Sequence, residues 1–160
     1  MAKQPSWDER AEAAGLVIPP PLPAHPMFPG VAIDGTTAYT SGIVAVEGPP
    51  WKLAYAGLVG EEIDVETAKK SAALAMLCTL ANLKGALGGS LDRIERFVKL
   101  MGFVRCRPDF GDPPLVINGA SEVLLAIFGA ELLPARSAIG VASLPSGASV
   151  EIDTIVKLHS

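Results

Sequence analysis

The sequence has little charge and no cluster of lysine or arginine. Only 19% of its 160 residues are Asp, Glu, Lys or Arg, and the formal net charge is −4. Proteins that bind the phosphate backbone of nucleic acids concentrate basic residues on one face or stripe. The scattered basic residues and the acidic balance therefore predict that nucleic acid is not a partner.

Cysteine is almost absent. The two cysteines, Cys78 and Cys106, lie 28 residues apart in apolar runs. This spacing is typical of neither a zinc site nor a CxxC redox pair. We interpret both as buried, reduced thiols, which favours a cytoplasmic location. The sequence has no motif for a metal or a cofactor, and we expect neither.

Long apolar runs are also missing, since the longest falls short of the roughly 18 residues that a membrane-spanning helix needs. The N-terminal stretch MAKQPSWDERAEAAG is polar and lacks the apolar core of a signal peptide. We therefore expect no membrane association. Hydrophobic residues nevertheless make up 49% of the chain. Surface buried between subunits would account for that share, and so would a rich core.

The length predicts one domain. Residues 1–27 form an N-terminal extension in this interpretation, with a short helix followed by Pro19–Pro23, which can be neither helix nor central strand. We interpret that proline-rich run as an extended tether lying over the domain proper, which spans residues 28–160. A PxxP ligand motif is the alternative, although one such match is weak.

Hydrophobic periodicity and turn residues predict the elements of the domain. A hairpin turns at Asp34-Gly35, and Asp64 caps a helix that runs to about Leu87. The remaining expected elements are a short strand near 53–56, a central strand over 96–106, a helix over 119–128, and a last hairpin of strands 136–142 and 149–157. This order predicts an α+β fold with one mixed sheet and two helices on one face.

The last two predicted strands carry the candidate chemistry. Period-two alternation puts Arg136, Ala138 and Gly140 on one face of the first strand, and Glu151 and Asp153 on one face of the second. We expect the β-branched residues to face the helices, so that the charged residues share the opposite face with small side chains. An arginine fork suits a carboxylate, and a glutamate suits acid–base chemistry. The alternative is a structural ion pair of Arg136 with Glu151 or Asp153.

The segment Pro134–Asp153, reading PARSAIGVASLPSGASVEID, resembles the C-terminal signature of the Rid/YjgF family. That signature is an arginine, a short strand, Leu-Pro, a turn, and an alternating Val-Glu-Ile-acid strand. Thr40-Ser41-Gly42 resembles the family's early Thr-Ser-Gly motif, and Asn118 matches its asparagine at the second helix. The resemblance covers about residues 28–157.

This resemblance implies a chorismate-mutase-like fold, in which three subunits close their sheets into a barrel with clefts between neighbours. Active family members hydrolyse enamines and imines, such as 2-aminoacrylate, to 2-oxo acids and ammonia. By resemblance, Arg136 would bind the substrate carboxylate and Glu151 would orient the attacking water. Backbone groups near Gly42 would hold the nitrogen or carbonyl end of the substrate. Asn118 and Ala138 would line the cleft, and Phe28 of the adjacent subunit would pack over the ligand.

Two residues depart from the family pattern, since Phe28 stands where the deaminases usually have tyrosine and Ala138 where many have cysteine. The resemblance implies a homotrimeric hydrolase similar to 2-iminobutanoate/2-iminopropanoate deaminase, acting on a small carboxylate-bearing metabolite. The alternative is a non-catalytic trimer that binds small carboxylates. A ribonuclease, a name that some family members carry, agrees less well with the acidic composition.

Overall fold

The fold was analysed in a computed structural model that describes residues 4–160, so residues 1–3 of the predicted extension lie outside the described residues. Its elements, in chain order, are α1 (Trp7–Ala13), β1 (Val31–Asp34), β2 (Thr37–Thr40), β3 (Ile43–Val44), β4 (Val46–Glu47), β5 (Lys52–Leu53), α2 (Val65–Ala86), β6 (Ile94–Arg105), α3 (Pro113–Phe128), β7 (Ala135–Val141) and β8 (Val150–Leu158). Short 3₁₀ turns lie at Ala130–Leu132 and Pro145–Gly147.

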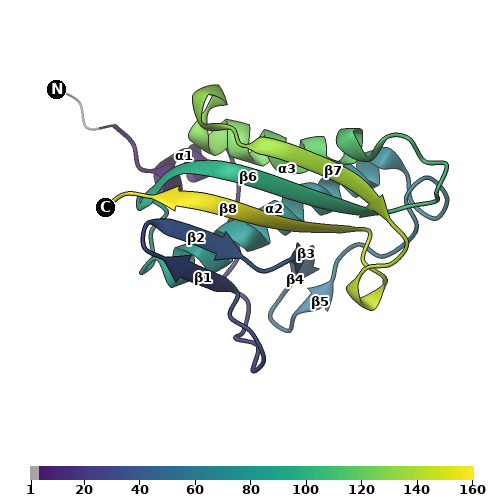
Figure 1. The fold of residues 1–160 in the computed structure, drawn as a ribbon, viewed down its shortest axis with the longest axis horizontal. Coiled ribbons are helices and arrows are strands. Elements are labelled where there is room, and N and C mark those ends of the chain that lie inside the picture. The colour runs from purple at the N-terminus through teal and green to yellow at the C-terminus, as the bar shows by residue number, and fades with distance from the viewer. Residues whose placement is uncertain (1–3) are drawn as a thin grey trace.

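One mixed sheet carries the fold, with strand order β1-β2-β8-β6-β7 and with β3 paired to β8 beyond the end of β2. Strands β6 and β7 are parallel, whereas β8 is antiparallel to β6, β2 and β3. Helices α2 and α3 lie side by side behind the sheet in Figure 1, and no helix of residues 4–160 covers the face toward the viewer. The predicted α+β class, with one mixed sheet and helices on one face, is confirmed.

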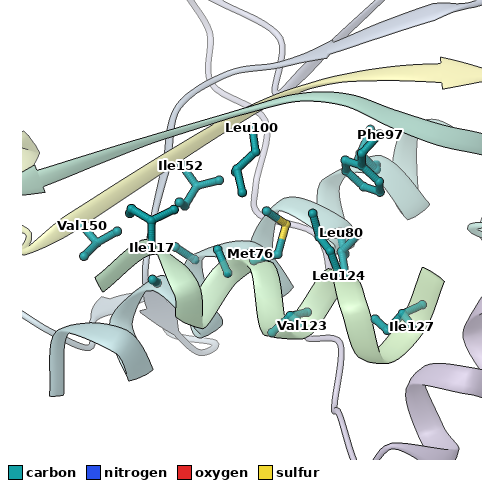
Figure 2. Packing of buried hydrophobic residues seen from close by; sticks show 14 of the residues in the cluster. Met76, Leu80, Phe97, Leu100, Ile117, Val123, Leu124, Ile127, Val150 and Ile152 are labelled. Carbon is teal, nitrogen blue, oxygen red and sulfur yellow. The ribbon is translucent and has the colours of Figure 1, made fainter. Parts of the chain in front are cut away.

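The core lies between this sheet and the two long helices (Figure 2). Phe97 and Leu100 of β6 and Ile152 of β8 point toward α2 and α3, and all three side chains are fully buried. Met76 and Leu80 of α2 meet them from the helix side. Asp64 begins α2 as predicted, because its carboxylate accepts a hydrogen bond from the amide of Thr67 at 2.7 Å.

Strand β6 separates the last two strands, so the predicted C-terminal hairpin is wrong. β7 follows α3 and adds to the outer edge of the sheet parallel to β6, and β8 then pairs with the other edge of β6. Helix α3 also begins at Pro113, six residues before the predicted start, with proline at its first turn. Proline is tolerated there because the first N–H groups of a helix have no intrahelical partner.

The N-terminal segment packs on the helix side of the domain. The ring of Trp7 lies 5.0 Å from that of Phe128, and its Nε1 donates to the carbonyl of Ile94 at 3.1 Å. Further along, the amide of Leu22 donates to Oδ1 of Asn82 on α2 at 2.9 Å. The extended proline-rich segment therefore lies over α2, while the division of the chain at residue 28 stays a prediction.

Within residues 4–160, none of the helices combines the length and the apolar character needed to cross a membrane.

Candidate functional site

Arg136 lies on the helix side of the sheet. Its neighbour across the parallel pairing is Leu100, which is buried in the core and is itself paired with the buried Thr154 of β8. Paired residues of neighbouring strands project to the same side. Our expectation that Arg136 and Glu151 share a face is therefore wrong, and Ala138 and Gly140 also project toward the helix side.

Helix α3 fixes the guanidinium of Arg136. Nη1 donates to Oδ1 of Asn118 at 2.8 Å and to Oγ of Ser121 at 3.0 Å, while Nη2 donates to the carbonyl of Pro114 at 3.4 Å. These three bonds leave the Nε–H and a second Nη2–H without a partner among the described residues. Those two donors remain available to an anion such as a carboxylate, whose two oxygens can each accept a hydrogen bond.

The alternative of a structural ion pair does not hold for Arg136. None of the salt bridges among residues 4–160 includes it, and its three bonds go to neutral oxygens. The side chain is exposed rather than locked between carboxylates. An exposed cation held by neutral groups keeps its full charge available for an anion.

Glu151 lies on the opposite, uncovered face of the sheet. It is paired with Val44 of β3 and with Phe103 of β6, and Phe103 is paired in turn with Ile139 of β7. Its carboxylate also occupies the position that a Cβ atom at residue 42 would take. Glycine is therefore the only residue type that fits at position 42 unless the Glu151 side chain moves. The structure thus brings Gly42 and Glu151 into contact.

The carboxylate of Glu151 has no hydrogen bond from any described residue. Burial, together with the negative charge of Asp153 two residues along the same strand, raises the pKa of Glu151 above its ordinary value. Burial also raises the pKa of Asp153. A carboxyl group with a raised pKa and no fixed partner can accept a proton from water more readily than an ordinary surface glutamate.

Phe28 and Gly42 line one cavity of about 600 Å³. Its walls come from the extended segment Pro21–His25, the start of β1, the loop between β2 and β3, and the last turns of α2. Phe28 is 50% exposed, and its ring stacks on that of His25 with a centroid distance of 4.2 Å. The stacked rings of Phe28 and His25 therefore line the same cavity as Gly42.

The six predicted site residues thus form two groups within one chain. Phe28, Gly42 and Glu151 lie together at the β3 end of the sheet, whereas Arg136, Asn118 and Ala138 lie between β7 and α3. Sequence reasoning missed Ser121, which binds Arg136 from one helical turn beyond Asn118. Its three-residue spacing from Asn118 in a predicted helix is the signal that could have identified it.

Other reactive groups stand apart from both groups. Burial raises the pKa of the Cys78 and Cys106 thiols, which makes both poor nucleophiles. Among residues 4–160 the structure brings no three His, Cys, Asp or Glu side chains together as a metal site would require.

Solved structures of similar sequence share this fold. A protein of unknown function from Agrobacterium tumefaciens is 39% identical, with a TM-score of 0.87 over 96% of this chain and 94% of that one. A protein described as a putative endoribonuclease from Shewanella oneidensis is 28% identical, with a TM-score of 0.88 over 96% and 100% of the two chains. RidA from an Antarctic Psychrobacter species is 25% identical, with a TM-score of 0.59 over 87% and 94%.

A curated relative, Protein TCP17 of Trypanosoma cruzi, is 41% identical over 105 residues, or 65% of each chain. The match therefore spans just under two thirds of that protein's length. No family model matches the sequence.

Proposed function

The chain belongs to the Rid/YjgF family, and from that premise we propose that it hydrolyses 2-imino acids to 2-oxo acids and ammonia at clefts between the subunits of a homotrimer. The observation that carries this proposal is the separation of Arg136 from Glu151. A carboxylate-binding fork and an unpartnered carboxylate project from opposite faces of one sheet. Neither group completes a site within its own chain, but each can meet the other group on a neighbouring copy.

The uncovered sheet face supports the trimer. It carries a row of Glu151, Phe103 and Ile139 across three strands, and Tyr39 and Ile155 form a second pair on the same face. Ile139 and Tyr39 are each 45% exposed in the single chain. The exposed apolar side chains of this face are stabilised when further copies of the chain cover them.

The reaction requires positioning and proton transfer. Arg136 binds the substrate carboxylate through its two free N–H groups, and Asn118 and Ser121 hold the fork in place. Glu151 takes a proton from water while the water oxygen bonds to the imine carbon and the imine nitrogen gains a proton from solvent. The proton on Glu151 then passes to the amino group of the resulting carbinolamine. The hydroxyl proton is lost to water as the carbon–nitrogen bond breaks, which releases ammonia and the 2-oxo acid.

The runner-up is a trimer that binds small carboxylates without catalysis. It is favoured by the independence of the Arg136 site, whose three fixing bonds do not involve Glu151. An endoribonuclease, the activity named for the Shewanella protein, receives less support, because the chain has a net charge of −4 and no cluster of basic residues in its sequence.

The test generates imino acids from amino acids with an oxidase and follows the loss of each imine with and without this protein. Deamination faster than the spontaneous reaction supports the proposal. If every imino acid disappears only at its spontaneous rate, while the protein still binds 2-oxo acids, the result supports the non-catalytic carboxylate-binding trimer instead.

A further inference from the structure

The cavity beside Gly42 is larger and more apolar than a three-carbon acid requires. Its volume is about 600 Å³, and no Asp, Glu, Lys or Arg lines it. The walls are mainly proline and aliphatic side chains, with Ile43 and Val44 on one side and Leu22 on the other. Cavities of this size usually hold ligands with many non-hydrogen atoms. The lining favours an uncharged, apolar group.

One polar group in this lining lacks a partner. Asn82 is 9% exposed, and its Oδ1 accepts the amide of Leu22 at 2.9 Å. Because a backbone N–H needs an acceptor, this bond fixes which end of the side chain is oxygen. Nδ2 therefore turns the other way, and no described residue accepts its hydrogens. The nitrogen keeps contact with solvent, so it is a donor open to the cavity, and a ligand atom that accepts a hydrogen bond can take the place of water there.

Gly30 keeps this donor accessible. A Cβ atom at residue 30 would stand 3.1 Å from Nδ2 of Asn82, so any larger residue would cover the amide nitrogen. The other polar side chains of the lining are engaged or exposed. Oγ of Ser41 donates to the carbonyl of Pro29 at 2.7 Å, and His25 lies at the exposed rim, where its ring stacks on Phe28.

The cavity adjoins the proposed site, because Gly42 and Phe28 line it, whereas Glu151 lies outside its lining. Gly42 has the Glu151 carboxylate against its Cα on the uncovered side of the sheet. A substrate whose reacting carbon lies near Glu151 can therefore extend its side chain past Gly42 into the cavity.

We infer that this cavity is the side-chain subsite of the enzyme, and that the substrate is a 2-imino acid with an uncharged, apolar side chain larger than ethyl that carries one hydrogen-bond acceptor for Asn82. This inference rests on the proposed function. It assigns to Asn82 a role in substrate selection, and it assigns to the segment Pro21–His25 one wall of the subsite.

The first experiment titrates the full chain with unbranched 2-oxo acids from pyruvate to 2-oxoheptanoate in a calorimeter. We expect affinity to rise about fourfold for each methylene that enters the cavity. Ala86 lines the cavity at the end of α2, and Ala86→Leu would fill part of it. This variant should flatten the dependence of affinity on chain length, whereas Ala126→Leu, at an exposed position of α3, should keep it.

A second series replaces single methylenes of 2-oxoheptanoate with an ether oxygen. The analogue whose oxygen meets Nδ2 should bind at least as tightly as the parent acid. Asn82→Asp retains an oxygen for the Leu22 amide and removes the donor. This variant should therefore weaken binding of that ether by about tenfold more than it weakens binding of the parent acid. Equal losses for both ligands would overturn the role of Asn82.

The two proposals fail in different ways. If the wild-type protein binds none of the acids, the carboxylate site of the proposed function is wrong. If it binds all chain lengths with equal affinity, and Arg136→Ala abolishes that binding, the carboxylate site stands and the side-chain subsite is rejected.

Discussion

Arg136 and Glu151 project from opposite faces of the same sheet, the first toward α3 and the second toward the uncovered side. A single chain therefore cannot bring the two side chains onto one small substrate. This relationship is the reason that the proposed site needs a second subunit, and it makes the oligomeric state a direct test of the mechanism.

We predict that the protein is a trimer and that Ile139→Glu dissociates it. Ile139 is 45% exposed on the uncovered face, and a charge buried there between subunits would have no partner. Leu125→Glu is the matched control, because Leu125 is 46% exposed on the outer side of α3. Light scattering at micromolar concentration should give a trimer mass for the wild type and the control, and a smaller mass for Ile139→Glu. A monomeric wild type would exclude the trimer.

Mixing two variants that each lack one half of the site should restore part of the activity. If each site takes Arg136 from one subunit and Glu151 from its neighbour, trimers reassembled from equal amounts of Arg136→Ala and Glu151→Gln chains contain roughly one quarter intact sites. Each variant alone contains none. The imine-hydrolysis assay, run after joint dissociation and reassembly, measures the recovery. Activity that stays at the level of the separate variants would place both groups in the same subunit's site.

Arg136→Ala should weaken binding of 2-oxo acids without unfolding the protein. Loss of one charge-assisted pair costs about 1.5–3 kcal/mol, or roughly ten- to a hundredfold in affinity. Arg93→Ala, at an exposed turn before β6, is the control and should bind as the wild type does. Calorimetry gives the affinity and thermal unfolding gives the stability. Unchanged affinity would remove Arg136 from the site, and a large fall in Tm would give it a structural role instead.

Glu151→Gln should slow the reaction and leave product binding nearly unchanged. Removal of a general base typically lowers the rate by roughly 10²–10⁴-fold, while Arg136 still supplies the anion contact. Single-turnover rates and calorimetry separate the two effects. A variant as fast as an active wild type would leave the hydrolysis standing and remove Glu151 from it.

The pH dependence of kcat/KM should report the same carboxyl group. A base acts only when deprotonated, so activity should rise with pH through the pKa of Glu151, which lies above its ordinary value. Asp153 contributes to that shift through its negative charge. Asp153→Asn should therefore move the rising limb of the profile to lower pH. A limb that moves to higher pH, or not at all, would contradict this coupling.

Gly42→Ala should impair catalysis by displacing the Glu151 carboxylate, because an added Cβ would stand where that carboxylate lies. Gly111→Ala is the matched control, since a Cβ there would meet nothing within 4 Å and its backbone needs no positive φ. We expect a large fall in the rate of imine hydrolysis for the first variant and none for the second. A Gly42→Ala enzyme with wild-type rates would show that the position of Glu151 does not matter.

Local patterns predicted many of the elements. The carboxylate of Asp64, followed by an apolar stripe, predicted α2 within one residue of its observed end. The alternation of Val150, Ile152, Thr154 and Val156 correctly predicted which face of β8 is buried. These signals succeed because capping and burial act on neighbouring residues of one element.

The start of α3 shows where such patterns fail. Pro113 and Pro114 read as a loop, yet proline is compatible with the first turn of a helix, and packing of Val116 and Ile117 against the sheet extends the helix to include them. Tertiary burial thus overrode a local signal.

The sequence by itself determined which residues could take part in the chemistry, namely an arginine suited to binding a carboxylate and a glutamate suited to proton transfer. It also determined that Arg136 shares a face with Ala138 and Gly140, and Glu151 with Asp153. Only the tertiary structure decided which of these faces meets the helices. Alternation fixes the relative orientation of residues within one strand, but the pairing of β7 and β8 on either side of β6 fixes the orientation of one strand against another. That pairing depends on contacts between segments far apart in the sequence, and it separates the two halves of the proposed site.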